Sequence, residues 1–518
     1  MMKQLSVLLL LHLLTMLALS SPRVLATKEY KAAIFEHKPY YLHDGSIPSR
    51  KKALRIMRTN TAVYRVQARA ASQRGAQVIV FPEDGIYGIF YERNEILHYL
   101  EPIPNVAIPG TPLIPCTSSE MPPNTEILQE LSCMAKNNSI AVVTNMGDIQ
   151  YCTKSTDPNC PDDGRYQFNT DVVFDTDGRL LAKYHKQHLY HEKQFDTPAK
   201  CKFVTFVASF GVRFGVFTCF DMLFKSPAVD LVRTYGVKNI VFPTAWFHGF
   251  PLLNAIQYQQ AWSRSMCVNL IAANAILPVL DGSGSGIYAC GEVKAYTYGM
   301  EPSKQHLLVA TLQDMEQYDE RSTWWQPSYP NVFVRRETKY NELRNIRTFK
   351  GQIINDVYTL TKLVEPAGEL SVCDNNVCCH LGYKLSGEGN LKETFALGAF
   401  SGNHNPEGYY LEVCVVFKCL SSEDQSCGEA VQESETVFQS LQLSGNFSSN
   451  TTVFPGVLGS GFTLAQPKEV KFTRNEILME NFEKPLVTAA LLGREYSKDK
   501  PSYENKSWKV YKSENSNF

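Results

Sequence analysis

The spacing of apolar side chains over the first 312 residues predicts helices and strands in alternation. Residues 49–73 carry apolar side chains at intervals of three and four, which predicts a helix ending before Gly75. Residues 78–81 form a short, continuously apolar run, which is typical of a buried strand. Further strands are predicted at 30–35, 139–145, 171–174, 180–185, 214–219, 239–243, 268–274 and 306–312, and further helices at 127–136, 227–235 and 254–264. Strands that alternate with helices indicate an α/β fold with a covered sheet.

The pattern changes near residue 316, where Trp324, Trp325, Pro327 and Pro330 interrupt the periodicity. The following segment has short apolar or alternating runs, such as 409–418 and 486–492, and few helical signals, so it is predicted to be a smaller, mainly β domain. The predicted organisation is a signal peptide at 1–26, an α/β domain at 27–315, a linker at 316–349, a β-rich domain at 350–496 and a polar tail at 497–518.

Composition and charge narrow the range of partners and compartments. The chain has 518 residues, with 51 Lys and Arg against 52 Asp and Glu, and a net charge of −1. Such a balance gives no general attraction to nucleic acid or to an acidic membrane surface, so neither is expected as a partner. The 14 cysteines are more than a cytosolic enzyme of this size usually keeps. They indicate an oxidising compartment.

The N-terminus predicts secretion. Lys3 precedes a largely apolar run at residues 5–19, and Val24-Leu25-Ala26 precedes a polar Thr27, so cleavage is expected after Ala26. A membrane anchor is the alternative, but about 15 apolar residues fall short of the roughly 20 that a spanning helix needs.

Glycosylation and the C-terminal sequence fit the same compartment. Sequons predict glycosylation at Asn137, Asn446, Asn450 and Asn505. Residues 496–518 are polar and charged, whereas a lipid-anchor signal needs a hydrophobic tail. We therefore expect a soluble, extracellular glycoprotein without a lipid anchor.

The cysteines fall into groups with different expected roles. Those of the predicted second domain are Cys373, Cys378, Cys379, Cys414, Cys419 and Cys427. Their spacings lack the paired C-x-x-C arms of a zinc site, so disulfides are expected instead. Cys116, Cys133, Cys152 and Cys160 lie in polar, loop-rich surroundings and are expected to pair as well.

Cys219 differs because it ends a predicted buried strand. Between a strand end and a helix start, converging backbone N–H groups would lower the pKa of the thiol and could bind an oxyanion. Glu83 and Lys186 also follow predicted strands, whose carboxyl ends meet at one rim of an α/β sheet. Together the three could supply a nucleophile, a general base and an oxyanion stabiliser. The alternatives are a buried structural cysteine and ordinary ion pairs.

Several segments carry a family resemblance. Those resembling the three catalytic motifs of the nitrilase superfamily of carbon–nitrogen hydrolases are Phe81-Pro82-Glu83-Asp84-Gly85, Tyr184-His185-Lys186-Gln187 and Phe217-Thr218-Cys219-Phe220-Asp221. Those similar to its vanin and biotinidase branch are residues 163–174, 242–246, 284–288, 378–381 and 396–400. The resemblance covers nearly the whole mature chain. It implies a four-layer α-β-β-α sandwich followed by a smaller vanin-type domain, with no cofactor and no metal.

The resemblance also implies roles for single residues. Cys219 would be the nucleophile, Glu83 the general base and Lys186 the stabiliser of the tetrahedral oxyanion, while Glu192 matches a second glutamate that orients the site. The implied reaction is hydrolysis of a small-molecule amide through an acyl-thioester. Vanins split pantetheine into pantothenate and cysteamine, and biotinidase releases biotin from biocytin. Residues 136–140 and 184–187 look more vanin-like, whereas the spacing of residues 190–192 looks closer to biotinidase, so pantetheine is the predicted substrate and biocytin the alternative.

Some positions depart from the family pattern. Trp246 is followed by Phe247 and His248, where the family commonly has Met-Asn, and these three residues are predicted to line the substrate pocket. Gln257 stands where a Glu is usual, and an Asn-x-His stretch appears as Asn274-Ala275-Ile276. Both are expected to line or support the pocket. The changes leave open a second hypothesis, a catalytically silent secreted paralogue that acts by binding or signalling.

Three cysteines, Cys201, Cys267 and Cys290, have no recognised counterpart in the branch. If Cys219 is free, an odd number of cysteines remains, so at least one more is expected to be unpaired or bonded between chains.

Two further patterns carry no separate prediction of function. His185, His188 and His191 recur every three residues, but the resemblance implies no metal, so no metal site is predicted. Residues 282–286 alternate Gly and Ser but lack the Lys-Ser/Thr of a phosphate loop, so a turn beside the active site is expected.

Overall fold

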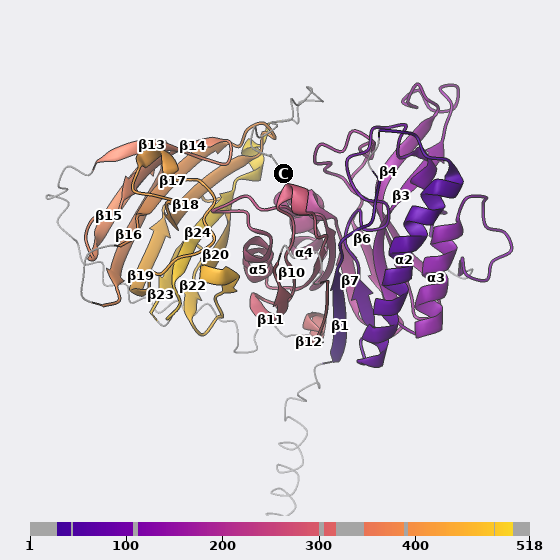
Figure 1. The fold of residues 1–518 in the computed structure, drawn as a ribbon, viewed down its shortest axis with the longest axis horizontal. Coiled ribbons are helices and arrows are strands. Elements are labelled where there is room, and N and C mark those ends of the chain that lie inside the picture. Colours follow the sequence, from indigo (N-terminus) through magenta and orange to yellow (C-terminus); the bar gives the residue numbers. More distant parts are fainter. Residues whose placement is uncertain are drawn as a thin grey trace, which may run out of the picture.

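A computed structural model describes residues 28–42, 45–106, 112–299, 305–317, 347–387, 392–480 and 482–500. The predicted signal peptide, most of the predicted linker, Asn505 and the tail beyond residue 500 lie outside the described residues. Two units stand side by side, one of helices and sheets and one of strands (Figure 1). In this described part of the chain, no helix is both long and apolar enough to cross a membrane.

Two six-stranded sheets form the first unit, in the orders β12-β1-β2-β3-β4-β5 and β11-β10-β9-β8-β7-β6. The strands of the first sheet are β1 (Glu29–Glu36), β2 (Val78–Val80), β3 (Ala141–Tyr151), β4 (Arg165–Phe174), β5 (Leu180–His185) and β12 (His306–Gln313). Those of the second are β6 (Val204–Val207), β7 (Arg213–Val216), β8 (Asn239–Thr244), β9 (Asn269–Asn274), β10 (Ser285–Ala289) and β11 (Glu292–Thr297). The neighbours β1-β2-β3 and β7-β8-β9 are parallel, and the outer pairs are antiparallel.

The alternation of side chains along the strands produces the layers. In β1, Ala32 and Ile34 pack into the core shared with the second sheet, whereas Ala33 and Phe35 pack against the helices outside the first sheet. The outer layers are α2 (Arg50–Gln73) and α3 (Glu126–Asn138) on the first sheet, and α4 (Asp230–Arg233) and α5 (Ala255–Met266) on the second. The four-layer α-β-β-α sandwich implied by the resemblance is confirmed.

The second unit packs a seven-stranded sheet on a five-stranded one. The larger sheet contains β13 (Thr348–Ile353), β14 (Asp356–Lys362), β17 (Phe395–Asn403), β18 (Tyr410–Lys418), β20 (Thr452–Gly459), β21 (Thr463–Leu464) and β24 (Leu486–Arg494). The smaller contains β15 (Ala367–Asp374), β16 (Val377–Leu385), β19 (Phe438–Gly445), β22 (Val470–Phe472) and β23 (Glu476–Met479). The core of the first unit continues into this one, because α5 packs against β20 and Arg264 Nη1 donates to the Pro455 carbonyl at 2.9 Å.

Two predicted elements are markedly shorter in the structure than in the prediction. The strand predicted at 214–219 ends at Val216, and Cys219 begins a 3-10 turn that ends at Leu223. The helix predicted at 227–235 is reduced to the four residues of α4, preceded by a single π turn at Lys225–Val229. The apolar pattern of the sequence does not reveal where the strand ends, because Phe217, Phe220 and Met222 are buried although they lie beyond it.

Six disulfides close within the units. The pairs are Cys116–Cys133, Cys152–Cys160, Cys267–Cys290, Cys373–Cys378, Cys379–Cys414 and Cys419–Cys427. Cys201 and Cys219 are the free cysteines. The expectation of a second unpaired cysteine is therefore confirmed, and two of the three without counterpart bond to each other.

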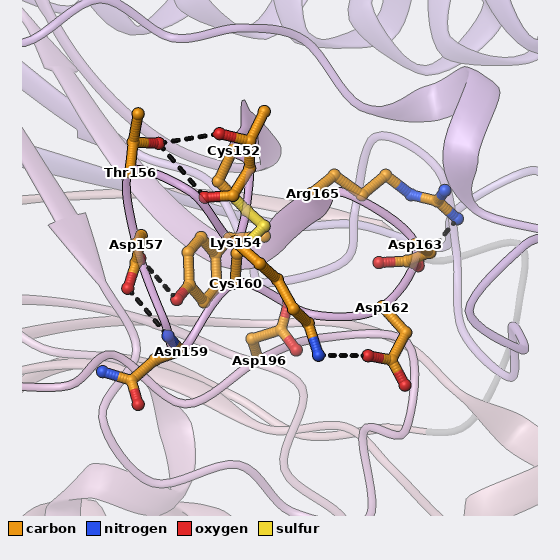
Figure 2. The surroundings of a disulfide bond; sticks show 12 residues. Cys152, Lys154, Thr156, Asp157, Asn159, Cys160, Asp162, Asp163, Arg165 and Asp196 are labelled. Atoms are coloured by element: carbon orange, nitrogen blue, oxygen red, sulfur yellow. Dashed lines mark hydrogen bonds and ion pairs between the residues drawn. A yellow bond between two sulfur atoms is a disulfide. The ribbon is translucent and has the colours of Figure 1, made fainter.

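The disulfide Cys152–Cys160 closes the long connection between β3 and β4, which further polar contacts fix to the rest of the unit (Figure 2). Arg93 Nε donates to Asp163 at 2.7 Å, and Arg93 Nη1 donates to Asp196 at 3.0 Å. Asp196 Oδ2 in turn accepts from the Gln167 amide of β4 at 2.8 Å. These bonds hold β4 against the segment that contains Glu192.

Candidate active site

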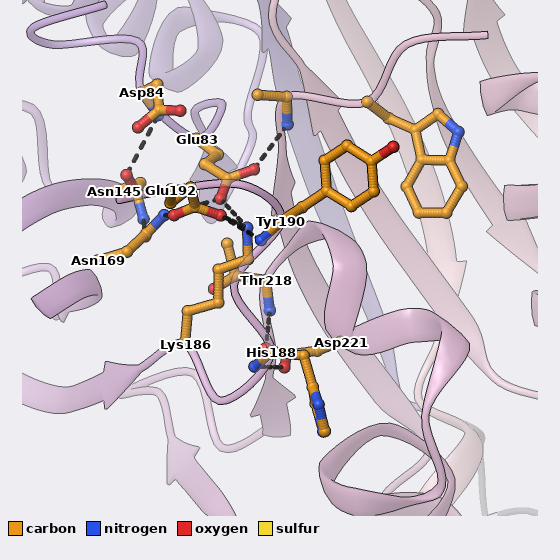
Figure 3. Close-up of polar contacts among 12 residues, drawn as sticks. Glu83, Asp84, Asn145, Asn169, Lys186, His188, Tyr190, Glu192, Thr218 and Asp221 are labelled. Atoms are coloured by element: carbon orange, nitrogen blue, oxygen red, sulfur yellow. Dashed lines mark hydrogen bonds and ion pairs between the residues drawn. The ribbon is translucent and has the colours of Figure 1, made fainter. Parts of the chain in front are cut away.

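The three sequence-predicted chemical groups meet at the carboxyl ends of strands. Glu83 lies three residues after β2, Lys186 directly follows β5, and Cys219 lies three residues after β7. All three are buried, with exposed fractions of 1%, 2% and 8% respectively. Because β2 and β5 run in the same direction in one sheet, Glu83 and Lys186 come together at its rim (Figure 3). Cys219 follows a strand of the second sheet and lies close enough for the charges of Glu83 and Lys186 to act on its thiol.

Lys186 is held between two carboxylates. Its Nζ donates to Glu83 Oε1 at 2.7 Å and forms an ion pair with Glu192 Oε1. The second oxygen of Glu83 accepts from the Ala245 amide, directly after β8, at 2.9 Å. Although burial opposes it, the two glutamates raise the pKa of Lys186 well above its usual value. The lysine is therefore a fixed cation, suited to stabilise a developing oxyanion and unsuited to act as a base.

Two asparagines on neighbouring strands orient the carboxylates. Asn169 of β4 donates through Nδ2 to Glu83 Oε1 at 2.8 Å and to Glu192 Oε2 at 2.7 Å. Asn145 of β3 donates to Asn169 Oδ1 at 2.6 Å, which turns that side chain so that its amino group faces the glutamates. Its own Oδ1 accepts from the Asp84 amide at 3.1 Å.

Cys219 is presented by a strained turn. Its φ of 45° places a non-glycine residue in the left-handed region, as a sharp change of direction after a strand requires. Thr218 anchors the turn by donating its hydroxyl to Asp171 Oδ2 at 2.6 Å. Asp221 completes it, because Oδ2 accepts from the Thr218 amide at 3.2 Å and from the Tyr184 hydroxyl at 2.6 Å. Both carboxylates are buried, and their contacts fix the sulfur position.

The expected lowering of the thiol pKa was wrong. Burial and the negative charge of Glu83 raise the pKa of Cys219 well above its usual value, and only Lys186 and hydrogen bonds oppose them. The helical turn after Cys219 has five residues, too few for a strong helix dipole. The thiol therefore rests protonated beside a carboxylate, and an attack by its sulfur would need a base to remove the proton.

The predicted pocket residues lie next to this site, around an aromatic patch. Phe247 contacts the ring of Tyr190 at 5.4 Å between centroids, and Tyr190 contacts Phe220, the residue after Cys219, at 4.8 Å. Trp246 is buried, and its indole Nε1 donates to the Leu253 carbonyl at 2.9 Å.

His248 turns toward the start of α5. Its Nδ1 accepts from the Ala255 amide at 3.2 Å, and its ring lies 4.9 Å from that of Tyr298. Burial lowers the pKa of His248 to about 4, so the ring is neutral at physiological pH.

Two further positions that depart from the family pattern, Asn274 and Gln257, lie in different parts of the structure. Asn274 supports the site, because its Oδ1 accepts from the Trp246 amide at 2.7 Å. Gln257 was expected at the pocket, but its buried side chain faces Gly456 of β20 in the interface between the units. The three histidines at residues 185–191 have different partners. His185 Nε2 donates to Asp148 Oδ2 at 2.9 Å, and His188 Nε2 donates to the Ser226 carbonyl at 2.8 Å. His191 Nε2 lies 3.5 Å from Glu407 Oε1.

Three of the predicted glycosylation sites are on the surface. Asn137, Asn446 and Asn450 are exposed, and Asn446 Oδ1 accepts from the Cys378 amide at 2.5 Å. Exposure permits modification, which stays a prediction.

Several supporting residues were not singled out from the sequence, among them Asn145, Asn169, Asp171, Asp221 and Tyr190. One signal was present: Gln167, Asn169 and Asp171 alternate along one face of β4, in a strand whose side chains are otherwise mostly buried and apolar. A row of buried polar side chains on one strand face needs partners, so it points to a site.

Two parts of the chain match known family models. Residues 41–261 match the model described as carbon-nitrogen hydrolase, and residues 347–499 match that of the vanin C-terminal domain. A Bos taurus protein named pantetheinase is 40% identical over 495 residues, covering 95% of this chain and 94% of the relative. A Mus musculus protein named biotinidase is 39% identical over 499 residues, covering 90% and 93%. Among solved structures, an amidase from Nesterenkonia sp. is 21% identical, with a TM-score of 0.40 over 57% of this chain and 94% of that one.

Proposed function

The chain belongs to the vanin and biotinidase branch of the carbon–nitrogen hydrolases, and from this premise we propose that it is a secreted pantetheinase with Cys219, Glu83 and Lys186 as catalytic residues. That it is a hydrolase acting on amides follows from the family itself. The substrate, the roles of the residues and secretion are the proposal. One observation carries it: Lys186 is fixed as a cation between two buried glutamates, beside a protonated thiol.

The first half-reaction forms a thioester. Glu83 takes the proton from the Cys219 thiol as the sulfur attacks the amide carbonyl carbon, and the ammonium of Lys186 stabilises the negative charge that develops on the carbonyl oxygen. The carbon–nitrogen bond then breaks, and the leaving nitrogen takes the proton from Glu83. The amine, cysteamine in the case of pantetheine, departs and leaves the acyl group on the sulfur.

The second half-reaction uses the same groups. Glu83 takes a proton from water, the hydroxide attacks the thioester carbonyl, and Lys186 again stabilises the oxyanion. The carbon–sulfur bond breaks, the acid is released, and the proton returns to Cys219. Glu192 acts by holding Lys186, and Asn169 acts by holding both glutamates.

Pantetheine is favoured as substrate because the relatives named pantetheinase match this chain over nearly its whole length. Biocytin is the second candidate, because relatives named biotinidase match it at a similar identity. We further propose that the changed residues Phe247 and His248 line the substrate pocket and affect the choice between amides; the contact of Phe247 with the Tyr190 ring supports this.

The test is release of cysteamine from pantetheine by the purified full-length protein, with biocytin in a parallel assay and Cys219→Ala as the blank. Cysteamine release that the variant abolishes supports the proposal. Release of biotin alone overturns the substrate and keeps the mechanism. Inactivity on both substrates, with Cys219 no more reactive toward a thiol reagent than a model thiol, favours the silent paralogue.

A further inference from the structure

Positive charge is concentrated on α2, the long helix outside the first sheet. The helix has seven Lys and Arg and no Asp or Glu, in a chain whose net charge is −1. It covers the first sheet on the side turned away from the second unit (Figure 1). Its apolar side chains pack against the sheet, so the cations on its opposite face are left to the solvent.

Five of these cations form one straight stripe along the helix. They are separated by three, four or seven residues, which places their side chains on the same helical face. At 1.5 Å per residue, the stripe is about 27 Å long. Its members are all exposed, and they are Lys51, Arg55, Arg58, Arg65 and Arg69.

Neighbouring carboxylates neutralise little of this charge. Glu130 of α3 pairs with Arg58 at 2.7 Å and lies 3.7 Å from Arg65, yet the two arginine side chains are 52% and 58% exposed. Exposed ion pairs of this kind are weak, so both guanidinium groups can exchange Glu130 for another anion. Lys51, Arg55 and Arg69 form no ion pair with any residue that the structure describes.

The stripe is unfavourable for the helix that carries it. Like charges stand one turn apart at residues 51 and 55, 55 and 58, and 65 and 69, and such pairs destabilise a helix. Lys51 also lies in the first turn, where the helix dipole favours a negative charge and α2 has none. Charge that opposes folding and has little use inside the protein is suited to binding an external anion.

The shape and chemistry of the stripe indicate a linear partner. The stripe is narrow, and the carboxylates of Glu126 and Glu130 lie beside it, so a flat anionic surface would meet them as well, whereas a single chain can follow the cations. The apolar side chains of α2 are buried, so the helix cannot insert into a membrane. Four of the five cations are arginines, whose planar guanidinium groups bind sulfate or phosphate through paired hydrogen bonds.

We propose that the α2 stripe binds a sulfated polysaccharide, which lies along the helix with its sulfate groups on the five cations. The inference goes beyond the proposed function. It uses the proposed secretion only to choose among linear polyanions, because sulfated polysaccharides are the extracellular ones, and it does not depend on the substrate. The stripe would retain the protein on cell surfaces and in matrices that carry sulfated sugars.

A heparin decasaccharide is the probe, and titration calorimetry of the full-length protein measures its affinity. The triple variant Lys51→Gln, Arg55→Gln, Arg69→Gln keeps good helix formers and should bind at least about tenfold more weakly. The matched control should stay within about twofold of the unaltered protein. It removes three exposed lysines of the second unit, by Lys384→Gln, Lys468→Gln and Lys471→Gln. Both variants lose the same charge, so a difference between them reports the place of the charge.

The salt dependence and the Tm distinguish lost contacts from misfolding. For the unaltered protein, the logarithm of the affinity should fall against the logarithm of the salt concentration with a slope of about −3. The slope should be shallower by about 2 in the triple variant. This variant should keep its Tm or raise it, because it removes the three like-charge pairs. Arg55→Lys with Arg69→Lys preserves the charges and should preserve the slope.

The choice of ligand tests the kind of partner. A heparin tetrasaccharide is too short to reach all five cations and should bind more weakly than the decasaccharide, and unsulfated hyaluronan of equal length should bind more weakly still. Binding needs no turnover, so a protein inactive on pantetheine would still give a clear result. Equal losses in the triple variant and its control, hyaluronan binding as tight as heparin binding, or binding to phosphatidylserine vesicles but not to the decasaccharide would each overturn the inference.

Discussion

At the scale of single residues, the charges around Lys186 determine the chemistry. Two glutamates share one lysine in a buried site, so the local charge is negative, and the Cys219 thiol is held protonated. A cysteine activated by a nearby cation alone would rest as a thiolate. In the mechanism that we propose, the proton moves from this thiol to Glu83 during attack, and the carboxylate takes part in every step.

Replacing Glu83 by Gln should separate ionisation from turnover. The glutamate's charge raises the pKa of Cys219, and Lys186 lowers it, so removal of the carboxylate should shift the thiol pKa downward. Turnover should nevertheless fall by about 10³-fold or more, because no base remains. Far-ultraviolet absorbance of the thiolate, titrated against Cys219→Ala, measures the shift. A thiol pKa in Glu83→Gln equal to or above that of the unaltered protein would contradict this account.

Glu192 should affect the rate more than binding. Glu192→Gln keeps the shape and the contact with Asn169 but removes one of the two charges that hold Lys186, so kcat should fall about 10- to 100-fold with little change in KM. Steady-state kinetics measures kcat and KM for this variant. Glu120→Gln, at an exposed glutamate, is the control and should change neither constant. A rise in KM alone would instead place Glu192 in the binding pocket.

The sequence was sufficient to single out the charged groups but not their environment. Glu83, Lys186 and Cys219 were found because each lies at or just after the end of a predicted strand, and Glu192 because of the family resemblance. The sign of the thiol pKa shift was wrong, because it depends on burial and on a glutamate 136 positions away in the chain. Such long-range proximity has no local signature.

At the scale of elements, periodicity succeeded where one face of an element is buried. The helix predicted at 49–73 is α2, capped by Ser49, whose hydroxyl oxygen accepts from the Lys52 amide. The strand predicted at 171–174 is only the end of β4, because the polar residues before it are buried by one another instead of being exposed. The apolar pattern of a sequence therefore predicts the elements that pack in the core. It does not predict a strand such as β4, whose buried side chains are partly polar because they support the site.

The disulfide Cys267–Cys290 should stabilise the fold without serving the chemistry. It joins the end of α5 to the turn between β10 and β11, near the start of β9, about 17 Å along that strand from the site. Its sequence separation of 23 predicts a loss of about 3 kcal/mol when both cysteines become alanine, by loop entropy. Denaturant unfolding measures the loss, with Cys201→Ser as the control. A large fall in kcat in the variant without this disulfide would contradict the view that the bond serves stability alone.

At the scale of the whole molecule, buried carboxyls connect stability to pH. Burial raises the pKa of Glu36 to about 8, and hydrogen bonds from Gly284 and Ser285 only partly offset it. The unfolded carboxyl loses its proton near its usual value of 4.5. At a pH between 4.5 and about 8, Glu36 is protonated in the folded protein and ionised in the unfolded chain. The free energy of unfolding therefore falls as the pH rises through this range, and it stops falling once the folded carboxyl is also ionised.

The Tm should therefore be lower by about 2–4 °C at pH 8 than at pH 6. Glu36→Gln removes one of several buried carboxyls whose pKa burial raises into this range, beside Glu101, Asp171 and Asp221, so it should weaken that dependence. Glu120→Gln, at an exposed glutamate, should leave the dependence unchanged. Calorimetry across this range tests the sign. A Tm that rises with pH in the unaltered protein would show that other groups dominate.

The interface between the units should hold without the linker. Arg494 of β24 is fully buried and donates through Nε to the Leu223 carbonyl, in the turn that begins with Cys219, at 2.8 Å. The core of the first unit continues into β18 and β20, and the disulfides all close within one unit. A chain cut once between the units would therefore be joined only by apolar packing and hydrogen bonds, and we expect these to keep the halves together.

A protease site inserted after residue 330, outside the described residues, allows that cut to be made in the folded protein. We expect the halves to elute together in gel filtration and to keep at least about half of the activity, because packing against the Cys219 turn is unchanged. Arg494→Ala removes the bond to Leu223 and the ion pair with Asp499, which keeps only its hydrogen bond from the Tyr410 amide. After cleavage this variant should therefore release the halves and the activity together. Separation of the unaltered halves under native conditions would mean that the linker, and not the interface, completes the active site.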